Sequence, residues 1–291
     1  MGNQLNKAVR VSELAAGIGL DYSGPDDVFF QVNPLSSVVK GGLCFSKVSL
    51  TSLEVDGAVI IAPRDTILVN CSVLFADSPR LAFAKALIWI ENNIGFIRGV
   101  ETQCIHPTAT ISPSAYIGQG VTIDAGSVIG HCVVINDGVR IGSNCIIKSG
   151  SIIGEDGFGF ERDMDGLPIR LVHLGSVYIG NFVEIGSLST VCKGTLEDTV
   201  VQDYVKIDDH VHVAHNCLIK KGAILIAFAE ISGGVEIGEF AWIGPSVSII
   251  QKLKIGDHAF VGIGANVLRN VESGVTVIGN PAKTYVPKSK K

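Results

Sequence analysis

The sequence predicts a mainly β protein in which a parallel β-helix follows a small α/β domain. Three observations support this fold class. A branched apolar residue recurs at every sixth position over much of residues 105–267, glycine often follows it, and residues 1–100 lack this repeat. A step of six fits neither the roughly 3.6-residue repeat of an amphipathic helix nor the two-residue alternation of a half-buried strand. It fits short strands that turn corners around a dry interior, with one side chain per hexad pointing inward.

The inward positions form two runs with the same step. The first run is Ile105, Ile111, Ile117, Ile123, Ile129, Ile135, Ile141, Ile147 and Ile153. The second run is Val201, Ile207, Val213, Ile219, Leu225, Ile231, Ile237, Ile243, Ile249, Ile255, Val261 and Val267. Three hexads make one triangular coil of about 18 residues, so residues that far apart stack on adjacent coils. Solenoids of this class wind left-handed, and we expect that hand here.

We expect two domains, an α/β domain over residues 1–100 and a β-helix domain over residues 101–291 that ends in a short tail. In the first domain, the apolar runs 58–62 and 66–69 predict buried strands. Asp77-Ser78-Pro79 predicts a helix start, and residues 81–93 continue with a helical apolar pattern.

The composition excludes several classes of protein. The net charge is −5 and the one basic run is the tail Lys288-Ser289-Lys290-Lys291, so we expect no nucleic-acid partner. No apolar run reaches the roughly 18 residues of a membrane span, and the first residues lack the apolar core of a signal peptide. The seven cysteines are odd in number and lack CxxC spacing. We therefore expect no disulfide framework and a reduced, cytoplasmic protein.

Two segments interrupt the ladder. The first begins with Gly154-Glu155-Asp156-Gly157-Phe158-Gly159-Phe160 and continues through the polar residues 161–166. The second lies between Val191 and Val201, where a spacing of ten residues forces 194–198 out of the coil. Such interruptions can be tolerated insertions, but loops that leave a rigid scaffold often carry sites, so we expect function there.

Three of the seven histidines, His210, His212 and His215, lie within six residues. Because Val213 points inward, His212 and His215 face outward or into a crevice. Histidine is the usual general base near neutral pH. One coil beyond His215, Gly233 could offer its backbone N–H to an oxyanion. Polar groups on the outer wall and a corner glycine would give the same pattern in a scaffold without activity.

A second interpretation is a zinc site. His173, His210 and His215 could supply three imidazole ligands, as in enzymes that resemble the γ-class carbonic anhydrases.

Three motifs together resemble those of the UDP-3-O-acylglucosamine N-acyltransferases of lipid A synthesis. They are Asp156-Gly157-Phe158-Gly159-Phe160, His173-Leu174-Gly175 and Val211-His212-Val213-Ala214-His215-Asn216. Gly41-Gly42-Leu43-Cys44-Phe45 and the segment 77–85 are similar to that family's nucleotide-binding domain. The resemblance implies a homotrimer with active sites in clefts between neighbouring solenoids. The acceptor would be a nucleotide-linked amino sugar, and the donor an acyl chain on the phosphopantetheine of acyl carrier protein or CoA. No metal and no permanently bound cofactor are implied.

The resemblance also implies roles for residues. His215 would be the general base and Gly233 the oxyanion donor, and no cysteine is needed as a nucleophile. Residues implied in substrate binding are Phe45, Asp156, Phe158, Phe160, His173, Asp208, Asp209, His212, Asn216 and Lys252. Lys252 stands where the family has a second histidine. The last residues are instead similar to those of acetyl-CoA-dependent sugar N- and O-acetyltransferases, which leaves that activity as an alternative.

Overall fold

The protein, a computed structural model, is described over residues 3–97 and 102–285 and divides into two compact units. The first unit contains residues 3–97 together with 159–174, and the second contains 102–158 together with 175–285. The basic tail at 288–291 lies outside the described residues.

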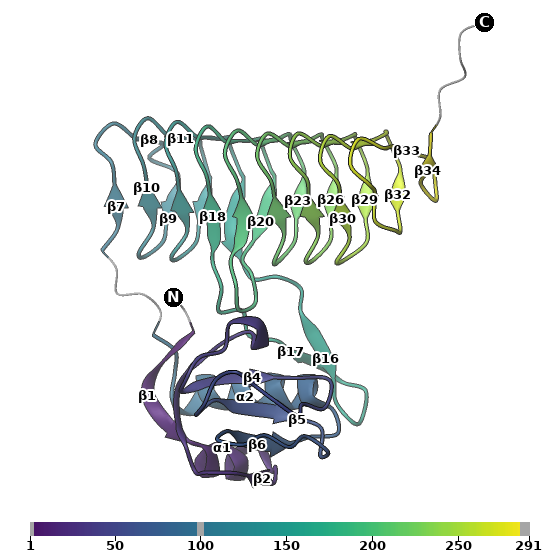
Figure 1. Cartoon of the computed structure of the whole chain (residues 1–291). Helices are drawn as coiled ribbons and strands as arrows, with labels where there is room; N and C mark the ends of the chain where they lie inside the picture. The colour runs from purple at the N-terminus through teal and green to yellow at the C-terminus, as the bar shows by residue number, and fades with distance from the viewer. Residues whose placement is uncertain (1–2, 98–101, 286–291) are drawn as a thin grey trace, which may run out of the picture. The chain divides into compact units, whose positions relative to one another are not determined.

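The first unit is built on a six-stranded sheet with the order β1-β3-β4-β5-β6-β2 (Figure 1). Its strands are β1 Gln4–Arg10, β2 Tyr22–Ser23, β3 Val28–Val32, β4 Gly42–Phe45, β5 Val59–Ala62 and β6 Ser72–Phe75. Strands β3 to β6 pair in parallel, whereas β1 and β2 pair antiparallel at the two edges. The helices are α1 Val11–Ile18, the short 3₁₀ helix η1 Leu35–Ser37 and α2 Pro79–Asn93. Helix α2 begins with proline at its first turn, as the sequence predicts, and packs against β4 and β5.

One predicted strand is wrong. Residues 66–69 lie in an irregular loop, in which Thr66 is buried and Ile67 and Val69 are 73% and 80% exposed. A four-residue apolar run predicts a strand only if a neighbouring strand pairs with it, and β5 already pairs with β4 and β6.

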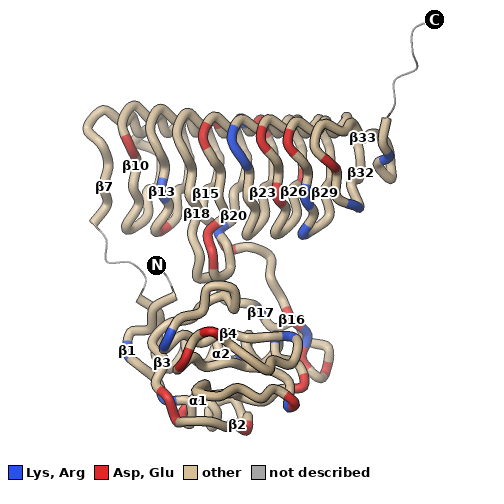
Figure 2. The backbone as a smooth tube through the Cα atoms, viewed as in Figure 1, with Lys and Arg blue, Asp and Glu red and all other residues tan. Residues whose placement is uncertain are grey.

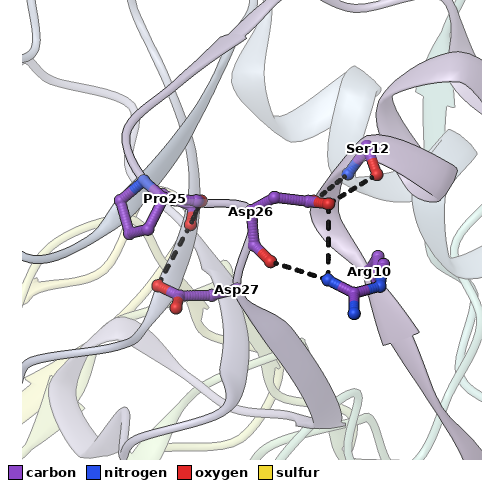
Figure 3. A network of polar contacts seen from close by, with 6 residues as sticks. Arg10, Ser12, Pro25, Asp26 and Asp27 are labelled. Carbon is purple, nitrogen blue, oxygen red and sulfur yellow. Dashed lines mark hydrogen bonds and ion pairs between the residues drawn. The ribbon is translucent and has the colours of Figure 1, made fainter.

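A polar network holds the start of α1 (Figure 3). The carboxylate of Asp26 accepts hydrogen bonds from the Ser12 backbone N–H at 2.9 Å and from the Ser12 hydroxyl at 3.0 Å. The Arg10 guanidinium lies 3.6 Å from the same carboxylate. The backbone bond from Ser12 is the main cause that lowers the pKa of Asp26 below its usual 3.8. Asp26 thus satisfies an N–H that has no partner within the helix.

The segment 159–174 belongs to the first unit although it interrupts the solenoid in sequence. It forms an antiparallel hairpin of β16 Phe160–Arg162 and β17 Pro168–Arg170. An ion pair between Arg80 and Glu161 links the hairpin to α2.

The second unit is a parallel β-solenoid with three faces, which we number in chain order (Figure 1). Face 1 contains β7 Cys104–Ile105, β10 Thr122–Ile123, β13 Arg140–Ile141, β18 Val177–Ile179, β21 Thr199–Val201, β24 Leu218–Ile219, β27 Glu236–Ile237 and β30 Lys254–Ile255. Face 2 contains β8 Thr110–Ile111, β11 Val128–Ile129, β14 Ile146–Ile147, β19 Glu184–Ile185, β22 Lys206–Ile207, β25 Ile224–Leu225, β28 Trp242–Ile243, β31 Phe260–Val261, β33 Thr276–Ile278 and β34 Lys283–Thr284. Face 3 contains β9 Tyr116–Ile117, β12 Val134–Ile135, β15 Ile152–Glu155, β20 Thr190–Cys192, β23 His212–Val213, β26 Glu230–Ile231, β29 Ser248–Ile249 and β32 Asn266–Val267.

The six-residue ladder is confirmed as the interior of this solenoid. Inward residues pair in register across coils, as Ile123 does with Ile141, and from Ile123 to Val267 they are buried. Ile105 is 38% exposed because β7 is the edge strand of face 1.

Glycines that follow the inward residue serve close packing at the corners. A Cβ added to Gly142 would lie 2.7 Å from the backbone oxygen of Gly180 on the next coil. Positive φ occurs instead at the second corner residue, where Asn216 (φ 58°) and Lys252 (φ 62°) adopt it.

No helix in the described residues is long and apolar enough to cross a membrane.

Candidate active site

Both interruptions of the ladder leave the solenoid at one corner, between face 3 and face 1, which we call the 3–1 corner. The first lies between β15 and β18, and the second between β20 and β21. His215 occupies the same corner on the following coil, between β23 and β24. Charged positions lie where the chain leaves the solenoid at β15, β18 and β20 (Figure 2). Two irregular loops and the candidate base therefore share one edge of the scaffold.

The second loop, residues 193–198, fastens both ends of the first. The Lys193 ammonium lies 2.6 Å from the Asp156 carboxylate, where the chain departs. The Asp198 carboxylate accepts the Ser176 backbone N–H at 2.8 Å, where the chain returns, and pairs with Arg140 at 2.6 Å. The second loop, which we call the corner loop, is thus held by ion pairs of Lys193 with Asp156 and of Asp198 with Arg140.

Asn216 connects this corner loop to the candidate base. Its side-chain oxygen accepts the Thr195 backbone N–H at 3.1 Å and the Thr195 hydroxyl at 2.7 Å. Its side-chain nitrogen donates to the backbone oxygen of Glu197 at 3.3 Å. Because an N–H only donates and a carbonyl only accepts, the two main-chain groups fix which end of the amide is oxygen.

The oriented amide determines the protonation pattern of His215. Its Nδ1 lies 3.0 Å from the Asn216 oxygen, so in the neutral imidazole Nδ1 carries the proton and Nε2 carries the lone pair. His215 is half-buried, and Nε2 is the nitrogen that can take a proton.

Gly233 lies directly against that nitrogen. A Cβ added to Gly233 would come 2.7 Å from Nε2 and from Cε1 of His215, so any other residue would displace the ring. Within the described residues, the Gly233 N–H makes no hydrogen bond to the protein. The candidate base and a backbone N–H that could act as a donor therefore lie close together at the 3–1 corner.

Lys252 lies on the next coil of the same corner. Its backbone N–H donates to the Gly233 oxygen at 3.0 Å, and its Cγ lies over Gly234, 3.5 Å from where a Cβ would be. This places a flexible cation within one coil of the Gly233 N–H. His212 lies exposed on face 3, with Thr190 and Glu230 as its neighbours in register.

Asp208 and Asp209 lie at a different corner, between face 2 and face 3. The Asp208 carboxylate accepts the Ala227 N–H at 3.2 Å, and the Asp209 carboxylate accepts the Ser187 N–H at 2.6 Å. His210 stacks on Phe228 at that corner, with ring centroids 4.9 Å apart. Within one chain these groups do not lie beside His215, because six residues carry the chain along a whole face.

Three predicted residues belong to the first unit. Phe45 packs against Phe83 with ring centroids 4.8 Å apart, and the Arg170 guanidinium lies 5.0 Å from the centre of the Phe160 ring. His173 is buried and donates from Nδ1 to the Leu171 oxygen at 2.9 Å. In the second unit, Phe158 is 88% exposed beside the departure point of the first loop.

The zinc site predicted from His173, His210 and His215 is not supported. His210 lies at the corner between faces 2 and 3 and His215 at the 3–1 corner, so these two imidazoles lie on different edges of the solenoid. His173 belongs to the first unit. The part of the chain that the structure describes has no group of three or more His, Cys, Asp or Glu side chains able to hold a metal.

The two cysteines nearest the site are not nucleophiles. Burial raises the pKa of the Cys217 thiol to about 12 and that of the Cys192 thiol to about 11. A nucleophilic cysteine needs the thiolate, which these surroundings disfavour. All seven cysteines are free thiols in the structure.

Comparisons with known proteins identify the family of the chain. No family model matches the chain. The UDP-3-O-acylglucosamine N-acyltransferase of Campylobacter lari is 34% identical to it, over 93% of this chain and 92% of the relative. The enzyme of the same name from Campylobacter curvus is 32% identical over the same shares.

The chain belongs to the UDP-3-O-acylglucosamine N-acyltransferase family.

A solved structure of a UDP-N-acetylglucosamine acyltransferase from Francisella novicida is also similar, with 27% identity and a TM-score of 0.47. That match covers 62% of this chain and 67% of the other.

Thr195 and Glu197 were not among the residues predicted from sequence. The ten-residue spacing predicts that residues 194–198 leave the coil, but it does not show which atoms of the loop turn back to Asn216. The one signal in the sequence that could have pointed to them is that this loop precedes His215 by about one coil, which places it on the adjacent coil.

Proposed function

We propose that this protein transfers an acyl group from a phosphopantetheine thioester to the amine of a UDP-linked 3-O-acylglucosamine, a step of lipid A assembly in the cytoplasm. The observation that carries the proposal is the pairing of His215 Nε2 with Gly233 at the 3–1 corner. Membership of the family supplies the acceptor, since the relatives are named for it.

The geometry fits a direct transfer. As the sugar amine adds to the thioester carbonyl, Nε2 of His215 takes a proton from the nitrogen. The negative charge that develops on the carbonyl oxygen is stabilised by the Gly233 N–H. When the tetrahedral intermediate collapses, the C–S bond breaks, and the imidazolium returns the proton to the departing thiolate. The products are an amide and a free thiol, and no acyl-enzyme is needed.

Further residues of the 3–1 corner and the first unit would hold the substrates. Asp156, Phe158, His212 and Lys252 offer polar, aromatic and cationic groups near the site, and Lys252 suits an anionic phosphate. Phe45, Phe160 and His173 of the first unit are proposed for the acceptor. Asp208 and Asp209 remain candidates through a neighbouring subunit.

We also propose a homotrimer in which other copies cover face 2. Trp242 and Phe260 point outward there, stacked with ring centroids 6.2 Å apart. Phe228 and Phe240 are exposed at the two flanking corners. Clustered exposed aromatic side chains are typical of a protein interface.

The function is tested with purified protein, UDP-3-O-acylglucosamine, and both acyl carrier protein and CoA thioesters as donors. His215→Ala should lower the transfer rate by roughly 10²–10⁴-fold, because it removes the general base. His106→Ala is a matched control, since His106 is an exposed histidine of the first coil whose ring hydrogen-bonds to Thr108, several coils from His215. Near-normal transfer by His215→Ala, or no amide product with any donor, would refute the proposal.

A further inference from the structure

The corner loop 193–198 makes contacts that a regular solenoid corner lacks. A six-residue step would join faces 3 and 1 directly, yet here Val191 and Val201 are ten residues apart. The additional residues bring two main-chain groups of the loop, the Thr195 N–H and the Glu197 C=O, onto the two ends of the Asn216 amide.

We propose that the corner loop fixes the tautomer of neutral His215, with the proton on Nδ1 and the lone pair on Nε2. We call this role a tautomer lock. The proposal rests on the function proposed above, because the lock matters only if Nε2 is the base. Thr195 and Glu197 are positioning residues that act through Asn216, and neither of them reaches the reacting atoms.

The lock follows from hydrogen-bond complementarity. If the Asn216 amide turned over, its NH₂ would face the Thr195 N–H and its oxygen would face the Glu197 C=O. Two hydrogen bonds would be lost, and a donor would face a donor and an acceptor an acceptor in a half-buried place. The oxygen therefore stays toward His215 and accepts the proton on Nδ1 at 3.0 Å. Without this constraint the neutral imidazole could carry its proton on Nε2, and that nitrogen could then not act as a base.

The backbone of the loop is shaped for this contact. A Cβ added to Gly194 would lie 1.6 Å from the Glu197 oxygen and 2.9 Å from the Asn216 side-chain nitrogen. Only glycine leaves room for the turn that brings Glu197 back to Asn216. The other end of Asn216 is also fixed, since its backbone N–H donates to the buried Thr199 hydroxyl at 2.9 Å.

The decisive variant deletes residues 194–197, which restores the six-residue step and leaves the ladder unbroken. Nitrogen NMR of histidine-labelled protein without substrates reports which imidazole nitrogen of His215 carries the proton, with the His215→Ala spectrum for assignment. The wild type should show Nδ1–H under conditions in which the imidazole is neutral. The deletion and Asn216→Ala should both shift the population toward Nε2–H and lower kcat at least about tenfold with KM nearly unchanged.

Two controls make the result specific. Asn181→Ala removes another corner amide, which accepts the Ser143 N–H at 2.9 Å away from His215, and should leave the tautomer unchanged. Thr195→Ser keeps both donors and should behave like the wild type. The wild type in the Nε2–H form, or an unchanged tautomer in Asn216→Ala, would overturn the proposal; if the deletion fails to fold, Asn216→Ala alone decides. A locked tautomer in a protein without acyl transfer would instead refute only the proposed function.

Discussion

At the scale of single residues, the candidate site depends on the absence of a side chain at Gly233. His215 and Gly233 are one coil apart, and the ring occupies the space that a side chain at 233 would need. The glycine also lets a substrate carbonyl approach the backbone N–H closely. One residue type thus suits both the proposed base and the proposed oxyanion donor.

Gly233→Ala is therefore expected to impair chemistry more than folding. Its φ is not in the left-handed region, so alanine is compatible with the backbone, but the new methyl group must push the His215 ring aside. We expect kcat to fall by roughly 10²-fold, the lower end of the range for loss of a general base, because the ring is displaced while the backbone N–H remains, and we expect a melting temperature close to that of the wild type. Steady-state kinetics and thermal unfolding measure the two effects. An equal loss of stability and activity would mean that the glycine serves the fold alone.

At the start of α1, the lowered pKa of Asp26 gives a pH dependence. A carboxyl group whose pKa is depressed in the folded state stabilises it above the unfolded pKa, and this contribution is lost as pH falls through the folded pKa. Asp26→Asn should lower the melting temperature at pH 7, and the difference from wild type should close as pH falls below the usual value of 3.8. Thermal unfolding measured from about pH 2.5 to about pH 7 tests this, because that range spans the usual pKa of an aspartate. A gap that stays constant over the range would contradict it.

At the scale of elements, periodicity in the sequence predicted the regular strands and helices but not the irregular segments. The inward ladder and the helix at residues 79–93 follow from local spacing, and both are confirmed. The run 66–69 has strand-forming residues but no strand to pair with, which no local pattern reveals. The hairpin 160–170 joins the first unit through contacts such as Arg80 with Glu161, far apart in sequence. His215 and Gly233 could be paired from sequence because the coil is regular there, whereas Thr195 could not, because its loop is irregular.

Face 1 offers a test of charge at this scale. The Glu236 carboxylate lies between the ammonium groups of Lys220 and Lys254, and the hydrogen bond from Lys220 is the main cause that lowers its pKa below 4.5. Glu236→Gln should be less stable than the wild type at pH 7, and the difference should vanish in acid below that pKa. Because the group is partly exposed, high salt should also shrink the difference. Urea unfolding at several pH values and salt concentrations measures this, and a salt-independent difference would argue against the ion pairs as its cause.

At the scale of the whole molecule, the three faces differ in the side chains that they present. Face 1 carries charged partners such as Arg140 and Glu236, and face 3 carries His212 and Glu230. Face 2 carries Trp242 and Phe260. The faces share one interior ladder, so their outward residues are free to serve different partners. The stacked pair of Trp242 and Phe260 on face 2 is the expected basis of the proposed trimer.

The trimer is tested by placing a charge on face 2. Trp242→Asp combined with Phe260→Asp should convert the trimer to monomers, because burying two carboxylates against an apolar partner is costly. Met164→Asp is the control, since Met164 is 91% exposed in the hairpin of the first unit and far from face 2 in sequence. Light scattering after size-exclusion chromatography gives the mass, and circular dichroism shows whether the solenoid stays folded.

Both aspartates lie on outward positions, so the interior ladder is untouched and a folded monomer is the expected product. A folded double variant that remains a trimer would show that the subunits meet elsewhere. Loss of acyl transfer in the monomer would in addition place part of each active site on a neighbouring subunit, where Asp208 and Asp209 could approach His215.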